Sequence, residues 1–305
     1  MKMHPRLRGL IPATHTPFRA DGALNLDVVE KQAAHLLANK VHRAFIGGTT
    51  GESASLTLEE RRRLAVRWFE VARGTSLEII VHVGSNCVTD AVDLAAQAQS
   101  LGARGIAALA PSYFKPRSID LLIACCAEIA SGAPETPFYY YDIPVMTGIH
   151  LPMADFMVQA AERIPTLCGL KFSNPDLMTF QLCVQACGGR FDVPYGSDES
   201  ILAALVLGGT SAVGSTYNFA APIYHRLWAA FERGDLAAAR VEQFRSAEMI
   251  QLLSGYGFMG AAKALMTMLG VDVGPARLPN GNLRPEQVAE LRGRLESMGY
   301  FDWIR

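Results

Sequence analysis

The stretch Leu167-Cys168-Gly169-Leu170-Lys171-Phe172-Ser173 is a short apolar run that ends at a turn, and a helical pattern follows it over Pro175–Ala186. A short apolar run of this kind is typical of a strand buried on both faces of a parallel sheet. The helix that follows provides the crossover that the next parallel strand requires. This segment therefore predicts one strand–helix unit, with a lysine at the end of its strand.

The same strand-then-helix unit recurs along the chain. Eight such units favour parallel strands closed into an α/β fold of the (β/α)8 TIM barrel type. We expect the strands at Gly9–His15, Arg43–Gly47, Glu78–Val83, Gly105–Ala110, Phe138–Tyr141, Leu167–Phe172, Phe191–Tyr195 and Ser211–Ser215. We expect the helices at Leu26–Asn39, Leu58–Arg73, Val88–Leu101, Ile119–Ala130, Pro152–Ile164, Pro175–Ala186, Glu199–Leu207 and Pro222–Arg233.

The last part of the chain has no strand pattern. Helical spacing covers Leu236–Leu253, Phe258–Leu269 and Pro285–Ser297, and glycine-containing stretches separate these segments. The sequence therefore predicts two parts, a (β/α)8 catalytic barrel over 1–234 and a C-terminal helical extension packed on the barrel over 235–305.

Composition limits the possible functions. The chain has 305 residues, is 50% hydrophobic and carries a formal net charge of −1, so it lacks the basic surface that nucleic acids or acidic membranes attract. No run approaches the ~18 apolar residues of a membrane span, and the start Met1–Arg6 lacks the apolar core of a secretory signal. The 6 cysteines lie mostly in apolar stretches without metal-ligand spacing, which favours reduced thiols and a cytoplasmic location.

Lys171 is energetically unfavourable in a core strand, because burial raises the free energy of its charged form. A lysine that is held neutral can act as a nucleophile toward a carbonyl group. The alternative is a strand-end lysine whose amine reaches solvent or pairs with a carboxylate.

Polar residues at the other strand ends favour the nucleophile. In a (β/α)8 barrel the chemistry takes place where the strand carboxyl ends meet the following loops, and six strands bring polar groups to this rim. These strand ends are Gly47–Glu52, Ala110–Phe114, Tyr139–Pro144, Lys171–Ser173, Tyr195–Glu199 and Gly214–Asn218.

Two of these strand ends have a definite chemical interpretation. Gly47-Gly48-Thr49-Thr50-Gly51-Glu52 can hold a small anion such as a carboxylate on its N–H and hydroxyl groups, or it is a plain turn with a threonine helix cap. Tyr141 lies one unit before Lys171, on the adjacent strand of such a barrel. Its phenol can move protons during carbonyl chemistry beside an amine, or it is a packed aromatic residue.

Together these motifs resemble the N-acetylneuraminate lyase / dihydrodipicolinate synthase family of class I aldolases, over nearly the whole chain. Gly47–Glu52 is similar to the family's carboxylate-binding motif, and Tyr141-Asp142-Ile143-Pro144 to its catalytic-tyrosine motif. Gly169-Leu170-Lys171 is similar to its Schiff-base-lysine strand. The resemblance implies a homotetramer that needs neither a metal nor a cofactor, because the imine itself is the electron sink.

Other motifs resemble the N-acetylneuraminate lyase branch, among them Gly214–Asn218, Gly196–Glu199 and Gly274–Pro279. Synthases carry a carboxylate-binding arginine where this chain has Met146, which cannot clamp a carboxylate. Asp142 and Asn174-Pro175 depart from the family pattern close to the sugar-binding rim.

The resemblance implies that Lys171 forms an imine with the C2 ketone of N-acetylneuraminate. Retro-aldol cleavage of the C3–C4 bond then gives N-acetylmannosamine and pyruvate, with Tyr141 relaying protons and Tyr113 of a neighbouring subunit supporting it. Tyr113 could equally be a rim aromatic packed at a subunit contact, and Asp198 and Glu199 could be an N-cap and a first-turn acid. The residues implied to bind substrate are Thr49, Thr50, Ser173, Gly196, Asp198, Glu199 and Ser215.

Four alternatives are considered at this point. A 2-keto-3-deoxy sugar acid aldolase, or dihydrodipicolinate synthase, would use the same lysine, tyrosine and threonines. A keto-acid-binding sensor would keep the pocket without turnover. A purely structural barrel has no use for polar residues at six strand ends on one rim.

Overall fold

Four parallel strands lie side by side in the order β3 (Glu78–His82), β4 (Gly105–Ala108), β5 (Phe138–Asp142) and β6 (Leu167–Phe172). Nearly all of their residues are buried. Burial on both faces explains why these strands have continuous apolar sequences without polar alternation. The predicted strands at these four places are confirmed, within two residues at their ends.

The computed structural model describes residues 6–305, so the predicted absence of a secretory signal concerns residues that lie almost entirely outside the described part. The described chain forms two compact units. The first contains 6–9, 78–197 and 203–213, and the second contains 10–77, 198–202 and 214–305. The division falls within β1 (Gly9–Pro12), α8 (Ile201–Val206) and β7 (Ser211–Gly214).

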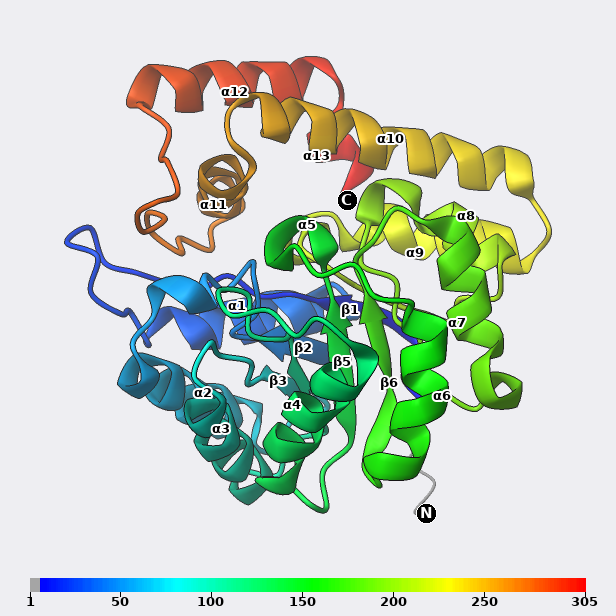
Figure 1. Ribbon diagram of the computed structural model, residues 1–305. Helices are drawn as coiled ribbons and strands as arrows, with labels where there is room; N and C mark the ends of the chain where they lie inside the picture. Colours follow the sequence, from blue (N-terminus) through cyan, green and yellow to red (C-terminus); the bar gives the residue numbers. More distant parts are fainter. Residues whose placement is uncertain (1–5) are drawn as a thin grey trace. The chain divides into compact units, whose positions relative to one another are not determined.

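In the first unit, the helices other than the short α5 pack against one another in chain order along the strands (Figure 1). Ser118 caps α4 by accepting a hydrogen bond from the N–H of Leu121, and Asp176 caps α7 in the same way from Thr179. A short helix, α5, which the sequence analysis did not predict, begins at Pro144 directly after Tyr141-Asp142-Ile143. The bounds are α3 (Val88–Ser100), α4 (Ile119–Ser131), α5 (Pro144–Thr147), α6 (Met153–Arg163) and α7 (Leu177–Gly189).

The strand expected at Phe191–Tyr195 differs from the prediction. The structure has isolated bridges here, from Asp192 to Gly169 and from Tyr195 to Phe172 and Ala212, instead of a continuous strand. Pro194 explains the interruption, because proline has no N–H to contribute to a ladder.

The second unit contains the predicted elements that remain, apart from the three that the division crosses. The three helices expected in the tail are confirmed as α10, α11 and α12, and the short α13 was not predicted. Thr57 and Glu60 form a reciprocal capping box at the start of α2. The bounds are α1 (Val28–Ala38), β2 (Arg43–Ile46), η1 (Ser53–Ser55), α2 (Leu58–Ala72), η2 (Asp198–Ser200), η3 (Thr216–Asn218), α9 (Ala221–Glu232), α10 (Leu236–Gly255), α11 (Phe258–Met268), α12 (Pro285–Ser297) and α13 (Tyr300–Trp303).

A buried ion pair joins α11 to the loop after β2 within this unit. Lys263 Nζ lies 2.7 Å from Glu52 Oε1, and both side chains are almost fully buried. The other oxygen of Glu52 accepts the backbone N–H of Arg277 at 2.8 Å and Nδ2 of Asn280 at 3.2 Å. Lys263 also donates to the carbonyls of Thr16 and Pro275, each at 2.9 Å. Both charges are therefore compensated, as buried charges require.

We predict that Lys263→Met lowers the free energy of unfolding by about 3–5 kcal/mol, because it leaves the Glu52 carboxylate buried without its cation. Urea unfolding at pH 7 measures the loss. Arg292→Met is the control, since Arg292 pairs with Glu296 on the exposed side of α12 and such pairs contribute about 0–1 kcal/mol. Equal midpoints for the two variants would contradict a structural role for the buried pair.

Candidate active site

Lys171 and Tyr141 are register partners on the adjacent parallel strands β6 and β5. The Nζ atom of Lys171 lies 3.9 Å from the centroid of the Tyr141 ring. Both residues are buried, with 5% and 2% of their surfaces exposed. The predicted side-by-side arrangement is therefore confirmed, and an amine and a phenol meet in a site that is largely shielded from water.

His82 adds a third polar side chain to this pair. It lies on β3, and its ring packs edge-on against that of Tyr141, with the centroids 5.9 Å apart. Its Nε2 faces the backbone N–H of Leu109 at 3.5 Å. The sequence analysis did not single out His82, although its place at the end of a predicted strand on the expected rim was a usable signal.

The turn after Lys171 brings Ser173 close to Gly196. A β-carbon at Gly196 would stand 1.9 Å from Ser173 Oγ, so only glycine leaves room for the serine hydroxyl. The N–H of Gly196 donates to the carbonyl of Phe172 at 2.8 Å. These two predicted substrate-binding residues therefore lie beside each other, next to the lysine strand.

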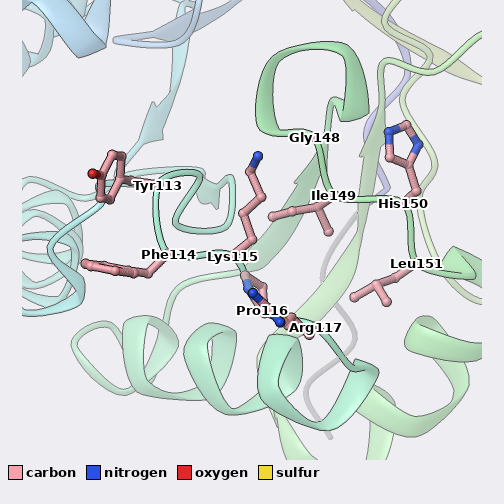
Figure 2. Close-up of a pocket in the computed structure, with 9 residues that line it drawn as sticks. All are labelled: Tyr113, Phe114, Lys115, Pro116, Arg117, Gly148, Ile149, His150 and Leu151. Carbon is pink, nitrogen blue, oxygen red and sulfur yellow. The ribbon is translucent and has the colours of Figure 1, made fainter.

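Tyr113 lies between β4 and α4 of the first unit. It is 81% exposed, and its ring packs edge-on against Phe114. With Lys115, Gly148 and His150 it lines a pocket of about 600 Å³, which Figure 2 shows. Neither Lys171 nor Tyr141 is among the residues of this pocket, so it is not the site of the buried amine.

Asn86 shapes the segment that carries Tyr113. Its Oδ1 accepts the backbone N–H groups of Ser112 and Tyr113 at 2.8 and 3.0 Å. This residue was not predicted from the sequence, because no local pattern connects it with a segment 27 positions later.

The carboxylate-loop candidates lie in the second unit, where Thr50 and Ser215 are joined. Their hydroxyl oxygens are 2.7 Å apart. Thr49 is partly exposed in the same loop, and Thr16 Oγ1 donates to the carbonyl of Gly51 at 2.6 Å. Hydrogen bonds between Thr50 and Ser215 and from Thr16 to Gly51 therefore fix the loop. Thr49 remains partly exposed.

Asp198 is buried in the second unit and holds the end of β7. Its Oδ2 accepts from the backbone N and Oγ1 of Thr216, at 2.9 and 2.6 Å. Burial raises the pKa of this carboxyl, and the Thr216 hydrogen bonds oppose the increase. Its Oδ1 lies over Gly214, where a β-carbon would collide with it. The adjacent Glu199 is exposed on η2.

The sequence-predicted residues thus form two groups. Lys171, Tyr141, Tyr113, Ser173 and Gly196 belong to the first unit, while Thr49, Thr50, Asp198, Glu199 and Ser215 belong to the second. Within residues 6–305, no group of three or more His, Cys, Asp or Glu side chains is placed to hold a metal ion. Across the same residues, no helix has the length and apolar character to span a membrane.

Residues 6–298 match the dihydrodipicolinate synthetase family. N-acetylneuraminate lyase of Gallus gallus is 39% identical over 306 residues, which cover 99% of either chain. The structure of Proteus mirabilis N-acetylneuraminate lyase has a TM-score of 0.93 and 39% identity, covering 96% of this chain and 99% of that one. A catalytic lysine mutant of the Ruminococcus gnavus sialic acid aldolase has a TM-score of 0.90 at 26% identity, over 95% and 94% of the two chains.

These likenesses cover nearly the full length of the chain, so they apply to its fold class as well as to its motifs. The fold class is the predicted (β/α)8 barrel with a C-terminal helical extension. The enzyme class is a carbon–carbon lyase of the class I aldolase type. The chain belongs to the dihydrodipicolinate synthetase family.

Proposed function

We propose that this enzyme cleaves N-acetylneuraminate to pyruvate and N-acetylmannosamine through a Schiff base on Lys171. The observation that carries the proposal is the buried contact between the Lys171 amine and the Tyr141 ring on neighbouring strands. The near full-length identity of 39% to a lyase named for this substrate gives the substrate class.

In the first step, the neutral amine of Lys171 attacks the C2 ketone of the open-chain sugar acid. Loss of water gives a protonated imine, and the phenol of Tyr141 moves the protons that this step requires. The imine then accepts the electron pair of the C3–C4 bond as the C4 hydroxyl loses its proton to Tyr141. Protonation and hydrolysis of the remaining enamine release pyruvate and regenerate the amine.

The substrate carboxylate binds to the hydroxyl and N–H groups of Thr49 and Thr50, with Ser215 holding Thr50 in place. The Thr50–Ser215 hydrogen bond supports this role. The sugar hydroxyl groups bind near Ser173 and Gly196 and near Asp198 and Glu199. The exposed carboxylate of Glu199 is free of the Thr216 contacts that occupy Asp198 Oδ2.

We also propose the remaining features that the family resemblance implies. The enzyme works as a cytoplasmic homotetramer, with a barrel over 1–234 and an extension over 235–305. The exposed Tyr113 reaches a neighbouring subunit's site and supports the Tyr141 of that site. Its 81% exposure and its aromatic partner Phe114 support a contact of this kind.

Sodium borohydride with pyruvate should attach a reduced pyruvyl group to Lys171 in the wild type, because the hydride traps the imine. Intact mass and peptide mapping detect the adduct. Lys171→Ala should stay unlabelled, whereas Lys115→Ala, which removes an exposed lysine, should label fully. An unlabelled wild type, or labelling at one site in Lys171→Ala, would remove the Schiff-base proposal.

Tyr141→Phe should lower kcat by about 10²–10⁴-fold, the usual loss when a general acid–base group is removed. Steady-state kinetics measure it, and pyruvate affinity should change little because the carboxylate loop is intact. Tyr140→Phe is the matched control: Tyr140 is the preceding residue of the same strand and packs on Phe156. A Tyr141→Phe enzyme with wild-type turnover rules out the phenol as the proton relay.

A panel of sugar acids assayed for pyruvate release tests the substrate. N-acetylneuraminate should give the highest kcat/KM, above 2-keto-3-deoxy sugar acids. A preference for the deoxy acids would identify the alternative aldolase, and activity only in dihydrodipicolinate synthesis would identify the synthase. Pyruvate binding without release from any compound would indicate a keto-acid sensor.

A further inference from the structure

Asp142 places a buried carboxyl group directly after Tyr141. It is the last residue of β5, and 2% of its surface is exposed. Burial raises the pKa of this carboxyl to about 6, while the Asn174 hydrogen bond and the charge of His150 oppose the increase. A carboxylate in such a place costs free energy at neutral pH, and nothing in the proposed mechanism uses it.

The contacts of Asp142 join the two strand ends that carry the reacting groups. Its Oδ2 accepts a hydrogen bond from Asn174 Nδ2 at 3.2 Å, and its carbonyl accepts the N–H of Ser173 at 2.8 Å. Asn174 Oδ1 in turn accepts the N–H of Asp176, the N-cap residue of α7, at 3.1 Å. The turn that follows Lys171 is therefore held by the residue that follows Tyr141.

We propose that Asp142 is a positioning residue whose ionised carboxylate, through Asn174, fixes the turn after β6 and so keeps Lys171 against Tyr141. It acts on the lysine strand and not on the substrate. This inference rests on the proposed Schiff-base function. If Asp142 has this role, imine formation on Lys171 depends on the charge of Asp142, which lies outside the reacting pair Lys171 and Tyr141.

Several groups around Asp142 keep one charge state across the pH range of interest. Burial raises the pKa of Tyr140 far above its usual value and that of the Cys183 thiol on α7 to about 12, so both are neutral. Asp176 at the start of α7 is exposed, and the hydrogen bonds from Thr179 lower its pKa, so it is ionised. The charges of these three groups therefore do not change over this pH range.

Two histidines are further ionisable groups beside these strand ends. His150 follows α5 and lies at the pocket that Figure 2 shows. Its positive charge lowers the pKa of the Asp142 carboxyl. His82 packs on the ring of Tyr141. An experiment on Asp142 must therefore separate its effect from theirs.

Replacing Asp142 with asparagine keeps the size and the hydrogen-bond acceptor but removes the charge. The wild-type kcat/KM should fall below about pH 6, where the carboxyl takes up a proton. Asp142→Asn should lower the plateau by about 10-fold, the order expected when a charge-assisted hydrogen bond becomes neutral. This variant should also lose the acid limb that belongs to Asp142.

Stability should change in the opposite direction. A carboxyl whose pKa is higher in the folded than in the unfolded state stabilises the fold at low pH, and this contribution is lost as the pH rises through about 6. Asp142→Asn has no carboxyl to ionise, so it does not lose this stability as the pH rises. Its thermal midpoint should exceed the wild-type midpoint at pH 7, and the difference should vanish near pH 4.

Two control variants distinguish charge from contact. Asn174→Ala removes the hydrogen bond and keeps the carboxyl, so it should lower the plateau by about 10- to 10²-fold. It should also weaken the acid limb, because the carboxylate acts through Asn174. Combined with Asp142→Asn, it should cost less than the two separate losses together, because both act through one contact. His150→Gln should leave the acid limb in place.

An acid limb in Asp142→Asn identical to that of the wild type would overturn the inference, as would a wild-type plateau in Asn174→Ala. The second result is decisive on its own if Asp142→Asn does not fold. Borohydride labelling separates this failure from that of the proposed function. Lys171 labelled in every variant with unchanged pH profiles rejects only the role of Asp142, whereas an unlabelled wild type rejects the Schiff base itself.

Discussion

The burial of the Lys171 amine against the Tyr141 ring of the neighbouring strand is the constraint on which the rest of the site depends. Lys171 and Tyr141 are held as register partners, and a one-residue slip of either strand would turn its side chain to the opposite face. Parallel pairing therefore positions chemical groups as well as stabilising the sheet. It brings an amine and a phenol together on neighbouring strands. The turn residues Ser173 and Asn174 then need only keep that register at its open end.

Elements with strong periodicity were predictable because their sequence pattern and their burial agree. Strands such as β6 and helices such as α12 follow the expected bounds closely. The failures have local causes. Pro194 interrupts a predicted strand, because the pattern was apolar but the residue cannot donate to a ladder. The four-residue helix α5 was missed because one turn is too short to establish a hydrophobic period.

The candidate site was predictable to the extent that fold topology places strand ends on a common rim. Lys171 and Tyr141 are the example, since adjacent units carry them. Contacts between distant segments had no such signal. Thr50 and Ser215 are 165 positions apart, and no pattern in either segment names the other. For the same reason, Lys263 could not be identified from the sequence as the partner of Glu52. A lysine in an apolar helix such as α11 looks like any half-exposed lysine.

The Glu52 carboxylate has a consequence for how the enzyme matures during synthesis. Its partner Lys263 is on α11, and the backbone N–H that it accepts belongs to Arg277, 225 positions later in the chain. A nascent chain that has emerged only as far as α10 carries the Glu52 carboxylate without its cation. Burial of that carboxylate costs free energy until α11 supplies Lys263. Packing of the Gly47–Glu52 loop in the interior is therefore coupled to the end of the polypeptide, which the ribosome makes last.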